Sequence, residues 1–502
     1  MKKRITVIGS GVAGLSCASF LAKEGHAVTL IEKNSSIGGR ARKFEAEGFV
    51  YDMGPSWYWM PDVFERFYNQ FGYKTEDFYE LKRLSPSYRV FWQDDTFDDV
   101  PSDLDEFYAW FEKLEPGSSK KLDKFLKEAA YKYEVGINDL VHKPSLKIGE
   151  FADIRIARGA FKMHLFSSFS KYIRKYFSHP KIIELLEFPI LFLGAMPKDT
   201  PALYSLMNYA DIKLGTWYPM GGMHKFIEAF ERIAREQGVT ILTEQEAVGF
   251  NIQEGEIIST NIKNRTSIEA DYIVSGADYE HTDRLLAKDY SNYSKDYWDS
   301  RLMAPSSLLF YLGIDKKVDN LIHHNLFFDE NFQVHAQEIY KTPKWPSAPL
   351  FYACCPSKTD DSVAPNGKEN LFLLIPLAPD LEDSEEMREK YYNIIMDRLE
   401  KRTGQSIKDA VIYKRSYCLQ DFKDDYHAFK GNAYGLANTL RQTAFLKPKI
   451  KNKKISNLFY TGQLTTPGPG VPPSIISGEV VAKEILKTIS NQKQKKNHEA
   501  TV

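Results

Sequence analysis

The sequence predicts an α/β fold, in which a doubly wound dinucleotide-binding domain holds an inserted domain of mainly antiparallel sheet plus helices. A glycine-rich turn at residues 9–14 separates a strand from a helix, which is how such a domain begins. Strand and helix signals of the same kind return at 224–275 and at 458–489. Between them lie a mostly helical stretch, 101–209, and alternating apolar segments within 307–376, which predict the inserted domain.

Each expected element follows from apolar periodicity and from the residues that interrupt it. In chain order they are strand 5–8, helix 13–24, strand 27–32, helical stretch 101–209, helix 224–237, strand 239–242, a hairpin around 253–256, strand 272–275, strands 307–314, 350–354 and 371–376, helix 385–402, strand 458–460 and helix 475–489. They divide the chain into a dinucleotide-binding domain at 1–75, 220–300 and 410–489, a substrate domain at 76–219 and 301–409, and a disordered tail at 490–502.

Composition limits the classes to which this chain can belong. Its 502 residues are 43% hydrophobic and 14% aromatic, enough to bury the cores of two or three structural units. The net charge of -1 argues against a protein that attracts nucleic acid through its overall electrostatic field, and we expect no nucleic-acid partner. The four cysteines have neither zinc-finger nor disulfide-scaffold spacing, which favours reduced thiols in a cytoplasmic protein.

The turn after the first strand reads Gly9-Ser10-Gly11-Val12-Ala13-Gly14, and Glu32 ends the next strand. In a dinucleotide site, Gly9 permits the tight turn and Gly11 lets backbone amides approach a pyrophosphate. Gly14 allows the helix to pack closely on the sheet, and the helix N-terminus adds partial positive charge. Glu32 would accept hydrogen bonds from the adenosine ribose, and its charge disfavours the 2′-phosphate of NADP.

The residues that follow Glu32 indicate which dinucleotide the site binds. Gly38-Gly39-Arg40 is a turn that can place backbone amides and a guanidinium beside a diphosphate. This extension resembles the large group of two-dinucleotide-domain flavoproteins that includes amine oxidases, protoporphyrinogen oxidases and carotenoid desaturases. We therefore predict that the cofactor is FAD and that the dinucleotide-binding domain is an FAD-binding domain.

Several further segments resemble one family over nearly the whole chain, from Lys3 to about Lys487. They are Tyr51-Asp52-Met53-Gly54-Pro55-Ser56, Trp217-Tyr218-Pro219-Met220-Gly221-Gly222-Met223, Val274-Ser275-Gly276-Ala277-Asp278, Gln420-Asp421-Phe422, Leu458-Phe459-Tyr460-Thr461-Gly462 and Pro467-Gly468-Pro469-Gly470-Val471-Pro472. Together they are similar to the bacterial and fungal phytoene desaturases, a carotenoid desaturase family of FAD-dependent oxidoreductases. The last two segments are the most specific, since in such proteins this loop caps the isoalloxazine ring.

The resemblance implies which residues contact FAD. They are Gly9, Gly11, Val12, Ala13, Gly14, Glu32, Lys33, Gly39, Arg40, Gly54, Pro55, Ser56, Val248, Gly462, Gln463, Gly470 and Val471. Val248 is included because the backbone at the matching position meets the adenine in related flavoproteins. The loop departs from the family pattern at Gln463, Pro469 and Pro473, where smaller residues are usual.

The resemblance also implies a reaction, the desaturation of phytoene toward lycopene by hydride transfer from allylic carbons to the flavin. Asp153 is the candidate catalytic residue for proton handling, because it occupies a family-like position; the alternative is a helix N-terminal residue favoured by the dipole. Trp57, Tyr58 and Trp59 either line the substrate tunnel or pack in the core. The electron acceptor, oxygen or a quinone, is left open.

Other functions on this fold also remain open. The nearest alternatives are a 1-hydroxycarotenoid 3,4-desaturase and a carotenoid isomerase. An amine or porphyrinogen oxidase is more distant, and a flavin-free prenyl-lipid chaperone is a different class of protein. The intact glycine turn and Glu32 argue against the chaperone, because they keep the nucleotide site complete.

We expect no metal site. His323 and His324 are adjacent in a predicted strand, where neighbouring side chains point to opposite faces, and no helix carries two histidines at ligand spacing with a third partner. By the same reasoning, Cys354 and Cys355 should face opposite sides of a strand rather than form a redox pair.

A C40 carotenoid substrate predicts contact with a membrane, because moving it through water forfeits roughly 0.8 kcal/mol per buried carbon. The longest apolar stretch, Leu185–Met196, falls short of the about 20 residues that span a bilayer, which predicts a peripheral protein. Arg155–Phe177 interleaves basic and aromatic residues, as in helices that bind anionic lipid; the alternative is an ordinary helix with a solvated basic face. We expect a cytoplasmic protein, peripheral on the inner face of the cell membrane.

Overall fold

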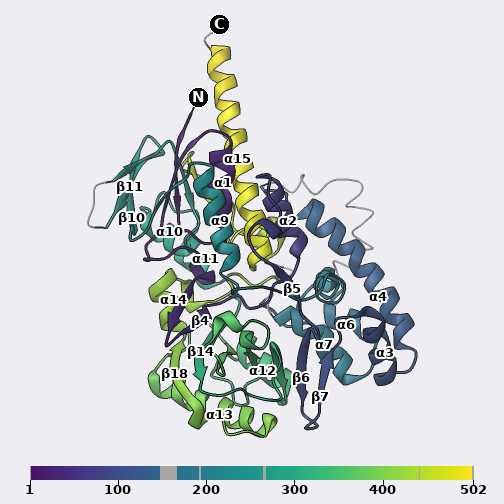
Figure 1. Ribbon diagram of the computed structural model, residues 1–502. Helices are drawn as coiled ribbons and strands as arrows, with labels where there is room; N and C mark the ends of the chain where they lie inside the picture. Colours follow the sequence, from purple (N-terminus) through teal and green to yellow (C-terminus); the bar gives the residue numbers. More distant parts are fainter. Residues whose placement is uncertain (1, 147–166, 192–193, 264–266, 440, 500–502) are drawn as a thin grey trace.

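The computed structural model describes residues 2–146, 167–191, 194–263, 267–439 and 441–499. A five-stranded parallel sheet, with strand order β19-β13-β1-β2-β9, forms the centre of one half of the molecule (Figure 1). Its strands are β1 Arg4–Ile8, β2 Ala27–Ile31, β9 Thr240–Leu242, β13 Tyr272–Ser275 and β19 Leu458–Tyr460. Beside it, an antiparallel sheet contains β10 Ala247–Gln253, β11 Glu256–Ile262 and β12 Ile268–Glu269.

Helices cover the parallel sheet because their apolar faces and those of the strands exclude water together. The helices of this half are α1 Val12–Lys23, α2 Pro61–Asn69, α9 Lys225–Glu236, α10 Tyr279–Leu285, α11 Lys295–Asp299, α14 Leu419–Tyr426 and α15 Val471–Glu499. Leu15 of α1, Phe226 of α9 and Ile476 of α15 belong to one buried cluster. The first and last parts of the chain therefore share a core, and both termini lie at the same end of the molecule (Figure 1).

The other half is built on a seven-stranded sheet with strand order β18-β14-β17-β16-β15-β6-β7. Its strands are β6 Tyr88–Trp92, β7 Phe97–Val100, β14 Ser306–Ile314, β15 His324–Phe328, β16 Phe351–Cys354, β17 Glu369–Leu377 and β18 Val411–Tyr417, and two-stranded sheets pair β3 Lys43–Ala46 with β4 Phe49–Asp52 and β5 Leu81–Arg83 with β8 Trp217–Pro219. Neighbouring strands are antiparallel except for β15 and β6, which are parallel.

Both faces of the seven-stranded sheet are buried, and successive residues alternate between them. Leu308 and Leu373 belong to a core shared with helix α13 Glu385–Thr403, whereas Leu309 and Leu374 belong to the large cluster on the opposite face. The sheet thus separates a conventional sheet-on-helix core from the side of the molecule that faces the parallel sheet.

A helical region adjoins the seven-stranded sheet, on the right in Figure 1. It contains α3 Leu104–Leu114, α4 Ser118–Tyr133, α6 Phe169–Ile173, α7 Pro180–Leu191 and α8 Leu206–Tyr209, with π-helical turns at Glu134–Leu140 and Ala210–Leu214. Helix α12 Phe332–Tyr340 lies instead against the seven-stranded sheet, where a ring nitrogen of His335 is 3.0 Å from the Pro376 carbonyl of β17. The predicted helical stretch, 101–209, is therefore helical wherever the structure describes it, apart from short connections.

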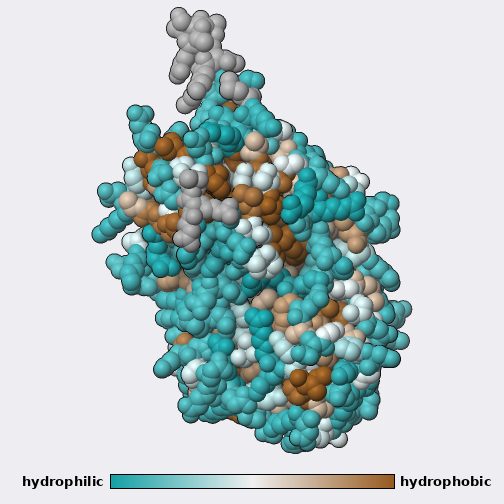
Figure 2. All heavy atoms as spheres, turned by 60° about the vertical axis from the view of Figure 1, so that its left-hand side comes forward, coloured by the Kyte–Doolittle hydropathy of each residue, from teal (hydrophilic) through white to brown (hydrophobic). Residues whose placement is uncertain are grey.

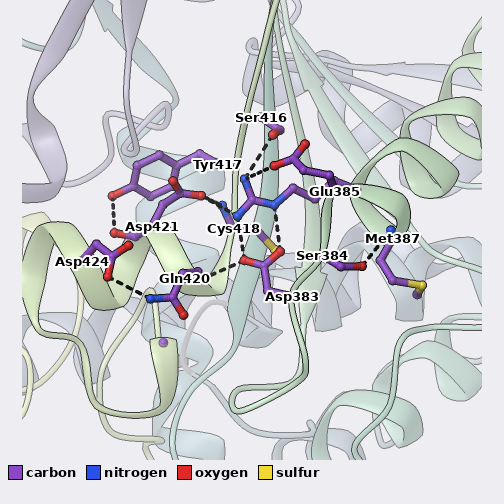
Figure 3. A network of polar contacts seen from close by, with 12 residues as sticks. Asp383, Ser384, Glu385, Met387, Ser416, Tyr417, Cys418, Gln420, Asp421 and Asp424 are labelled. Carbon is purple, nitrogen blue, oxygen red and sulfur yellow. Dashed lines mark hydrogen bonds and ion pairs between the residues drawn. The ribbon is translucent and has the colours of Figure 1, made fainter.

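A polar network joins α13 to the junction of β18 and α14 (Figure 3). The Arg388 guanidinium contacts the carboxylates of Asp383 and Asp421, each at 2.7 Å, and its side chain is only 10% exposed. Asp421 also accepts a hydrogen bond from the Cys418 amide at 2.8 Å, and the Gln420 amide donates to Asp383 at 2.9 Å. Buried charges are stable only when they are paired, so this network fixes where α14 leaves the sheet.

The structure differs from the predicted division of the chain in two places. The predicted boundary at 410 falls just before β18, which pairs with β14 and so belongs to the seven-stranded sheet. The predicted disordered tail begins at 490, but α15 continues to Glu499. The helix continues because no glycine or proline follows Gly478 and most of the later residues favour helix.

The surface that Figure 2 shows is mainly hydrophilic, with hydrophobic side chains gathered in its upper half. Val248 of β10 and Ile258 of β11 are among the large hydrophobic residues that are exposed, at 46% and 40%. In the part of the chain that the structure describes, no helix is both long and apolar enough to cross a bilayer.

The close approach of α15 to α1 depends on Gly478. A Cβ atom at this position would lie 2.6 Å from the Ala13 carbonyl oxygen and 2.7 Å from the Cys17 amide nitrogen. Non-bonded atoms do not approach this closely, and both neighbours are backbone atoms, which cannot easily move aside. The two helices can pack at this distance only because residue 478 has no side chain.

Gly478→Ala should therefore destabilise the protein by about 1–3 kcal/mol, the usual cost of overpacking, and lower its thermal unfolding midpoint. Ser490→Ala, at an exposed position of the same helix, is the matched control and should change stability by less than about 0.5 kcal/mol. Equal midpoints for Gly478→Ala and the unmodified protein would show that the helices are not in tight contact.

Candidate active site

The turn between β1 and α1 has the geometry of a phosphate-binding loop. Gly9 has a φ of +90°, which favours glycine, and a Cβ atom on Gly14 would lie 2.0 Å from the Gly9 carbonyl oxygen. A Cβ on Gly11 would meet no atom within 4 Å, so the backbone there is open to a ligand. Because α1 begins at Val12, its free amides and its positive dipole end point at the same space.

Glu32 follows β2 at the edge of the same space and is buried, with 5% exposure. One carboxylate oxygen accepts from the Ser10 amide at 2.9 Å and from the Ser10 hydroxyl at 2.7 Å. The other accepts from the Asn34 amide at 2.9 Å. The Asn34 side chain also donates to this second oxygen, at 3.1 Å, so the carboxylate is fixed and a ribose hydroxyl would take the place of the Asn34 side-chain donor.

Arg40 lies in the turn of 3₁₀ helix Gly39–Ala41. Its Nη2 donates to the Asn432 carbonyl at 3.3 Å, and the guanidinium carbon is 4.9 Å from the centre of the Tyr426 ring. Burial lowers the pKa of Arg40, and its Nε is a buried donor without a hydrogen-bond partner among the described residues. A cation with an unused donor beside the glycine turn fits a bound diphosphate.

The loop after β19 approaches the N-terminal turn from the other end of the chain. Since β19 pairs in parallel with β13, and β13 with β1, the carboxyl ends of all three strands lie at one edge of the sheet. Gly462 directly follows this edge, and a Cβ there would lie 3.8 Å from the Ala13 Cβ. Helix α15 begins at Val471 with its N-terminus at the same place.

A cavity of ≈ 400 Å³ joins these features. Its lining includes the following residues from the predicted set: Gly9, Gly11, Val12, Ala13, Gly14, Glu32, Lys33, Gly39, Arg40, Gly54, Pro55, Ser56, Gly462, Gln463, Gly470 and Val471. Val248 is outside the lining and its side chain is exposed, because the strand turns it outward; the preceding Ala247 lines the cavity instead. Asp153 lies outside the described residues.

The far part of the cavity is apolar and aromatic. Trp57 and Trp59 line it, whereas Tyr58 is fully buried and stacks on Phe64 at 4.2 Å; Tyr58 therefore packs in the core, and Trp59 belongs both to the buried core and to the lining. A second, smaller cavity of ≈ 60 Å³ shares part of its lining with the first. Tyr352, Leu374 and Tyr434 line both cavities and mark where the two meet.

Several lining residues have no counterpart in the predicted set. Tyr352, Leu374 and Tyr434 come from the inserted domain and the loop before β19, and no local pattern singles them out. Asp278 caps α10, accepting from the Glu280 amide at 3.0 Å, and burial raises its pKa. A signal for Asp278 did exist, since it directly follows the carboxyl end of a parallel strand.

The prediction for the adjacent histidines is wrong. The ring centres of His323 and His324 lie 4.4 Å apart, because His323 precedes the first residue of β15 and is not part of a regular strand. Burial lowers the pKa of His323 to about 3 and that of His324 well below its ordinary value. The prediction for the cysteines is confirmed, since Cys354 and Cys355 belong to clusters on opposite faces of the sheet.

The basic and aromatic segment 155–177 is described only from residue 167 onward. In that part Phe169, Tyr172 and Phe177 are at most 2% exposed, so their rings pack in the core. The alternative of an ordinary packed helix is therefore correct for this half of the segment. The earlier half, with Arg155, Arg158 and Lys162, lies outside the described residues.

Comparison with known proteins identifies the class of this site. Residues 12–486 match the model of the family described as flavin containing amine oxidoreductase. A carotenoid 3,4-desaturase of Haloarcula japonica is 39% identical over 97% of this chain and 98% of its own length. A zeta-carotene-forming phytoene desaturase of Myxococcus xanthus is 28% identical (96% of this chain, 94% of the relative), and a 4,4′-diapophytoene desaturase of Staphylococcus aureus is 30% identical (97% and 99%).

Solved structures share the fold at low identity. A crystal structure of an oxidoreductase from Methanosarcina mazei has a TM-score of 0.62 at 17% identity, covering 96% of this chain and 100% of that one. Putrescine oxidase bound to putrescine has a TM-score of 0.61 at 12% identity, covering 97% and 99%. The predicted fold class, FAD as the cofactor and an oxidoreductase activity are thereby confirmed.

Replacing Glu32 tests the nucleotide part of the site. Glu32→Ala should weaken FAD binding by about 10- to 100-fold, because a charged hydrogen-bond acceptor contributes about 1.5–3 kcal/mol. Flavin fluorescence during titration of the apoprotein measures the dissociation constant. Glu24→Ala, at an exposed position just after α1, is the control and should bind FAD as tightly as the unmodified protein. An unchanged constant for Glu32→Ala would remove the carboxylate from the FAD site.

Proposed function

Because this chain belongs to the flavin containing amine oxidoreductase family and, within it, to the carotenoid desaturases, we propose that it introduces double bonds into a C40 carotenoid. It is an FAD-dependent oxidoreductase, and FAD supplies the two-electron acceptor when it is bound. We further propose that the lining residues from the glycine turn, Glu32, Arg40 and the loop after β19 hold the FAD.

The observation that carries this proposal is the continuity between the nucleotide cradle and an apolar chamber. The cradle supplies glycine backbone, a fixed carboxylate and a buried guanidinium, whereas the chamber is lined by Trp57, Trp59, Tyr352, Leu374 and Tyr434. The smaller cavity beyond these residues has Phe188, Leu326 and Phe328 in its wall. A long hydrocarbon chain fits such a path, since almost no polar group is present to bind a hydrophilic substrate.

The residues of the chamber would act by positioning the substrate and excluding water. Packing against flat aromatic rings orders a conjugated chain and leaves no room for solvent beside it. The faces of Trp57, Trp59 and Tyr352 would also stabilise positive charge that develops on an allylic carbon when hydrogen is removed. The role of Asp153 in moving the proton stays a prediction.

Different observations favour two different substrates. Removal of hydrogen at positions 3 and 4 of a carotenoid is favoured by the 39% identity to a carotenoid 3,4-desaturase over nearly the whole length of both chains. Desaturation of phytoene toward lycopene is favoured by the sequence motifs and by relatives at 28% and 30% identity that act on phytoene or diapophytoene. We place 3,4-desaturation first because that relative is more similar.

The experiment compares the two substrates directly. The FAD-loaded protein is incubated with lipid vesicles that contain either phytoene or lycopene, and the products are separated by chromatography. We expect a product with two fewer hydrogens from lycopene, with its absorption shifted to longer wavelength because the conjugated chain is longer. Conversion of phytoene alone would favour the second substrate, and conversion of neither, in the presence of quinone and oxygen, would contradict the proposal.

A variant connects the assay to the chamber. Leu374→Trp should fill the neck between the two cavities and lower turnover at least about tenfold, as misplacement of a substrate usually does. FAD content is the control, because Leu374 is far along the apolar part and its replacement should leave the cradle loaded. A variant that retains both FAD and full turnover would exclude this neck from the substrate path.

We also propose that the protein collects its substrate from the inner face of the cell membrane as a peripheral protein. The support is the insolubility of the substrate and the pattern of basic and aromatic residues at 155–166. The aromatic residues of the described part, 167–177, are buried and offer no support.

Vesicle binding tests this proposal. The protein should sediment with vesicles of anionic lipid, and less so at high salt, because salt screens attraction beyond about 10 Å at 0.1 M. The triple change Arg155→Glu, Arg158→Glu and Lys162→Glu should abolish sedimentation. The control carries the same change in charge at the exposed residues Lys120, Lys127 and Lys295 and should still sediment. Identical behaviour of both triple variants would exclude the segment as the membrane contact.

A further inference from the structure

Three metal-ligating side chains meet behind the wall of the apolar chamber. One ring nitrogen of His323, one of His324 and the sulfur of Cys354 all lie within 4.8 Å of one another, and all three residues are buried. His324 and Cys354 are directly opposite each other in the antiparallel pair β15 and β16. The sheet therefore fixes His324 and Cys354, and His323 directly precedes the strand that carries His324.

The hydrogen bonds of the two rings leave one nitrogen of each unused. Nδ1 of His323 lies 2.8 Å from the Thr359 hydroxyl, and Nδ1 of His324 lies 2.6 Å from the Tyr352 hydroxyl. Nε2 of both rings is buried and has no hydrogen-bond partner within the described ranges. Leaving a buried polar group unpaired is unfavourable, so two neighbouring unpaired nitrogens indicate a ligand.

We propose that His323, His324 and Cys354 bind one Zn²⁺ ion. Two imidazoles and a thiolate are ligands that zinc prefers, and atoms within 4.8 Å of one another need to move closer by only about 1 Å to hold a tetrahedral ion with bonds of about 2.0–2.3 Å. In zinc sites the second ring nitrogen is normally held by a hydrogen bond that orients the ring. Thr359 and Tyr352 occupy that position here.

The surroundings suit a cation. Cys354 contributes one negative charge when the ion displaces its proton, and the Asp52 carboxylate is near enough to act electrostatically on Cys354. Asp52 is itself held by the amides of Met223 and His224, at 2.7 and 2.9 Å. Its charge and that of the thiolate together balance the two charges of Zn²⁺.

The ion would have a positioning role. Trp57 stacks on the His324 ring with centres 4.1 Å apart and an angle of 10° between the rings, and Trp57 lines the chamber. By joining β15 to β16 and fixing His324, zinc would hold this part of the wall in place. Zinc has no redox chemistry of its own, so the proposal is independent of electron transfer to FAD and of which carotenoid is the substrate.

The first test is zinc stoichiometry. Full-length protein without a histidine tag, loaded with FAD, is equilibrated with ZnCl₂, separated from free metal and analysed for zinc. We expect one tightly held zinc per chain, with two nitrogen ligands and one sulfur ligand in its X-ray absorption spectrum. Cys354→Ser should lose this zinc, whereas Cys355→Ser should retain it, because Cys355 is equally buried but lies on the opposite face.

A second variant keeps the test decisive if Cys354→Ser fails to fold. Thr359→Val preserves the shape of the side chain and removes only the hydroxyl next to His323, so it should weaken zinc binding about 10- to 100-fold. FAD content should stay the same, which distinguishes this effect from unfolding. Absence of bound zinc in the unmodified protein, or equal zinc affinity with and without the Thr359 hydroxyl, would overturn the proposal.

Discussion

The parallel pairing of β1, β13 and β19 is the constraint on which the site depends. It brings turns more than 450 residues apart in the chain to one edge of one sheet, where the N-termini of α1 and α15 meet. Parallel strands place their carboxyl ends together, so a ligand at this edge is contacted by both ends of the chain. The inserted domain needs only to place an apolar chamber against the same edge.

The residues predicted to bind FAD, apart from Val248, line one cavity, and they could be recognised in the sequence because each function there needs a particular residue at a fixed spacing. Gly9 must adopt a positive φ, Gly14 must have no side chain and Glu32 must follow the end of a strand. These requirements can be recognised from the sequence alone. The chamber could not be predicted in this way. Tyr352 and Tyr434 are far apart in the chain, and only the packing of the seven-stranded sheet brings them together.

Two errors, at His323 and in the tail after 490, and the open alternative at 155–177 have a common physical origin, because a local pattern does not determine what surrounds it. The alternation of side chains in a strand was applied to His323, which lies one residue before β15 begins. The basic and aromatic pattern of 155–177 is equally suited to a lipid surface and to a protein core, and Phe169 and Tyr172 are in the core. Disorder was predicted for the residues after 490 because they are polar. They favour helix and contain no glycine, so α15 continues to Glu499.

The contact at Gly478 also bears on the order of events during synthesis. Because α15 covers α1 and the loop before it lines the nucleotide cradle, a growing chain in which the segment from β19 to α15 has not yet been made lacks one wall of the cavity. Stable capture of the flavin must then wait until this segment has been made and has folded. Until that moment the side of α1 against which α15 packs is exposed, although α9 covers another side, so this is the stage at which the newly made protein is most prone to aggregate.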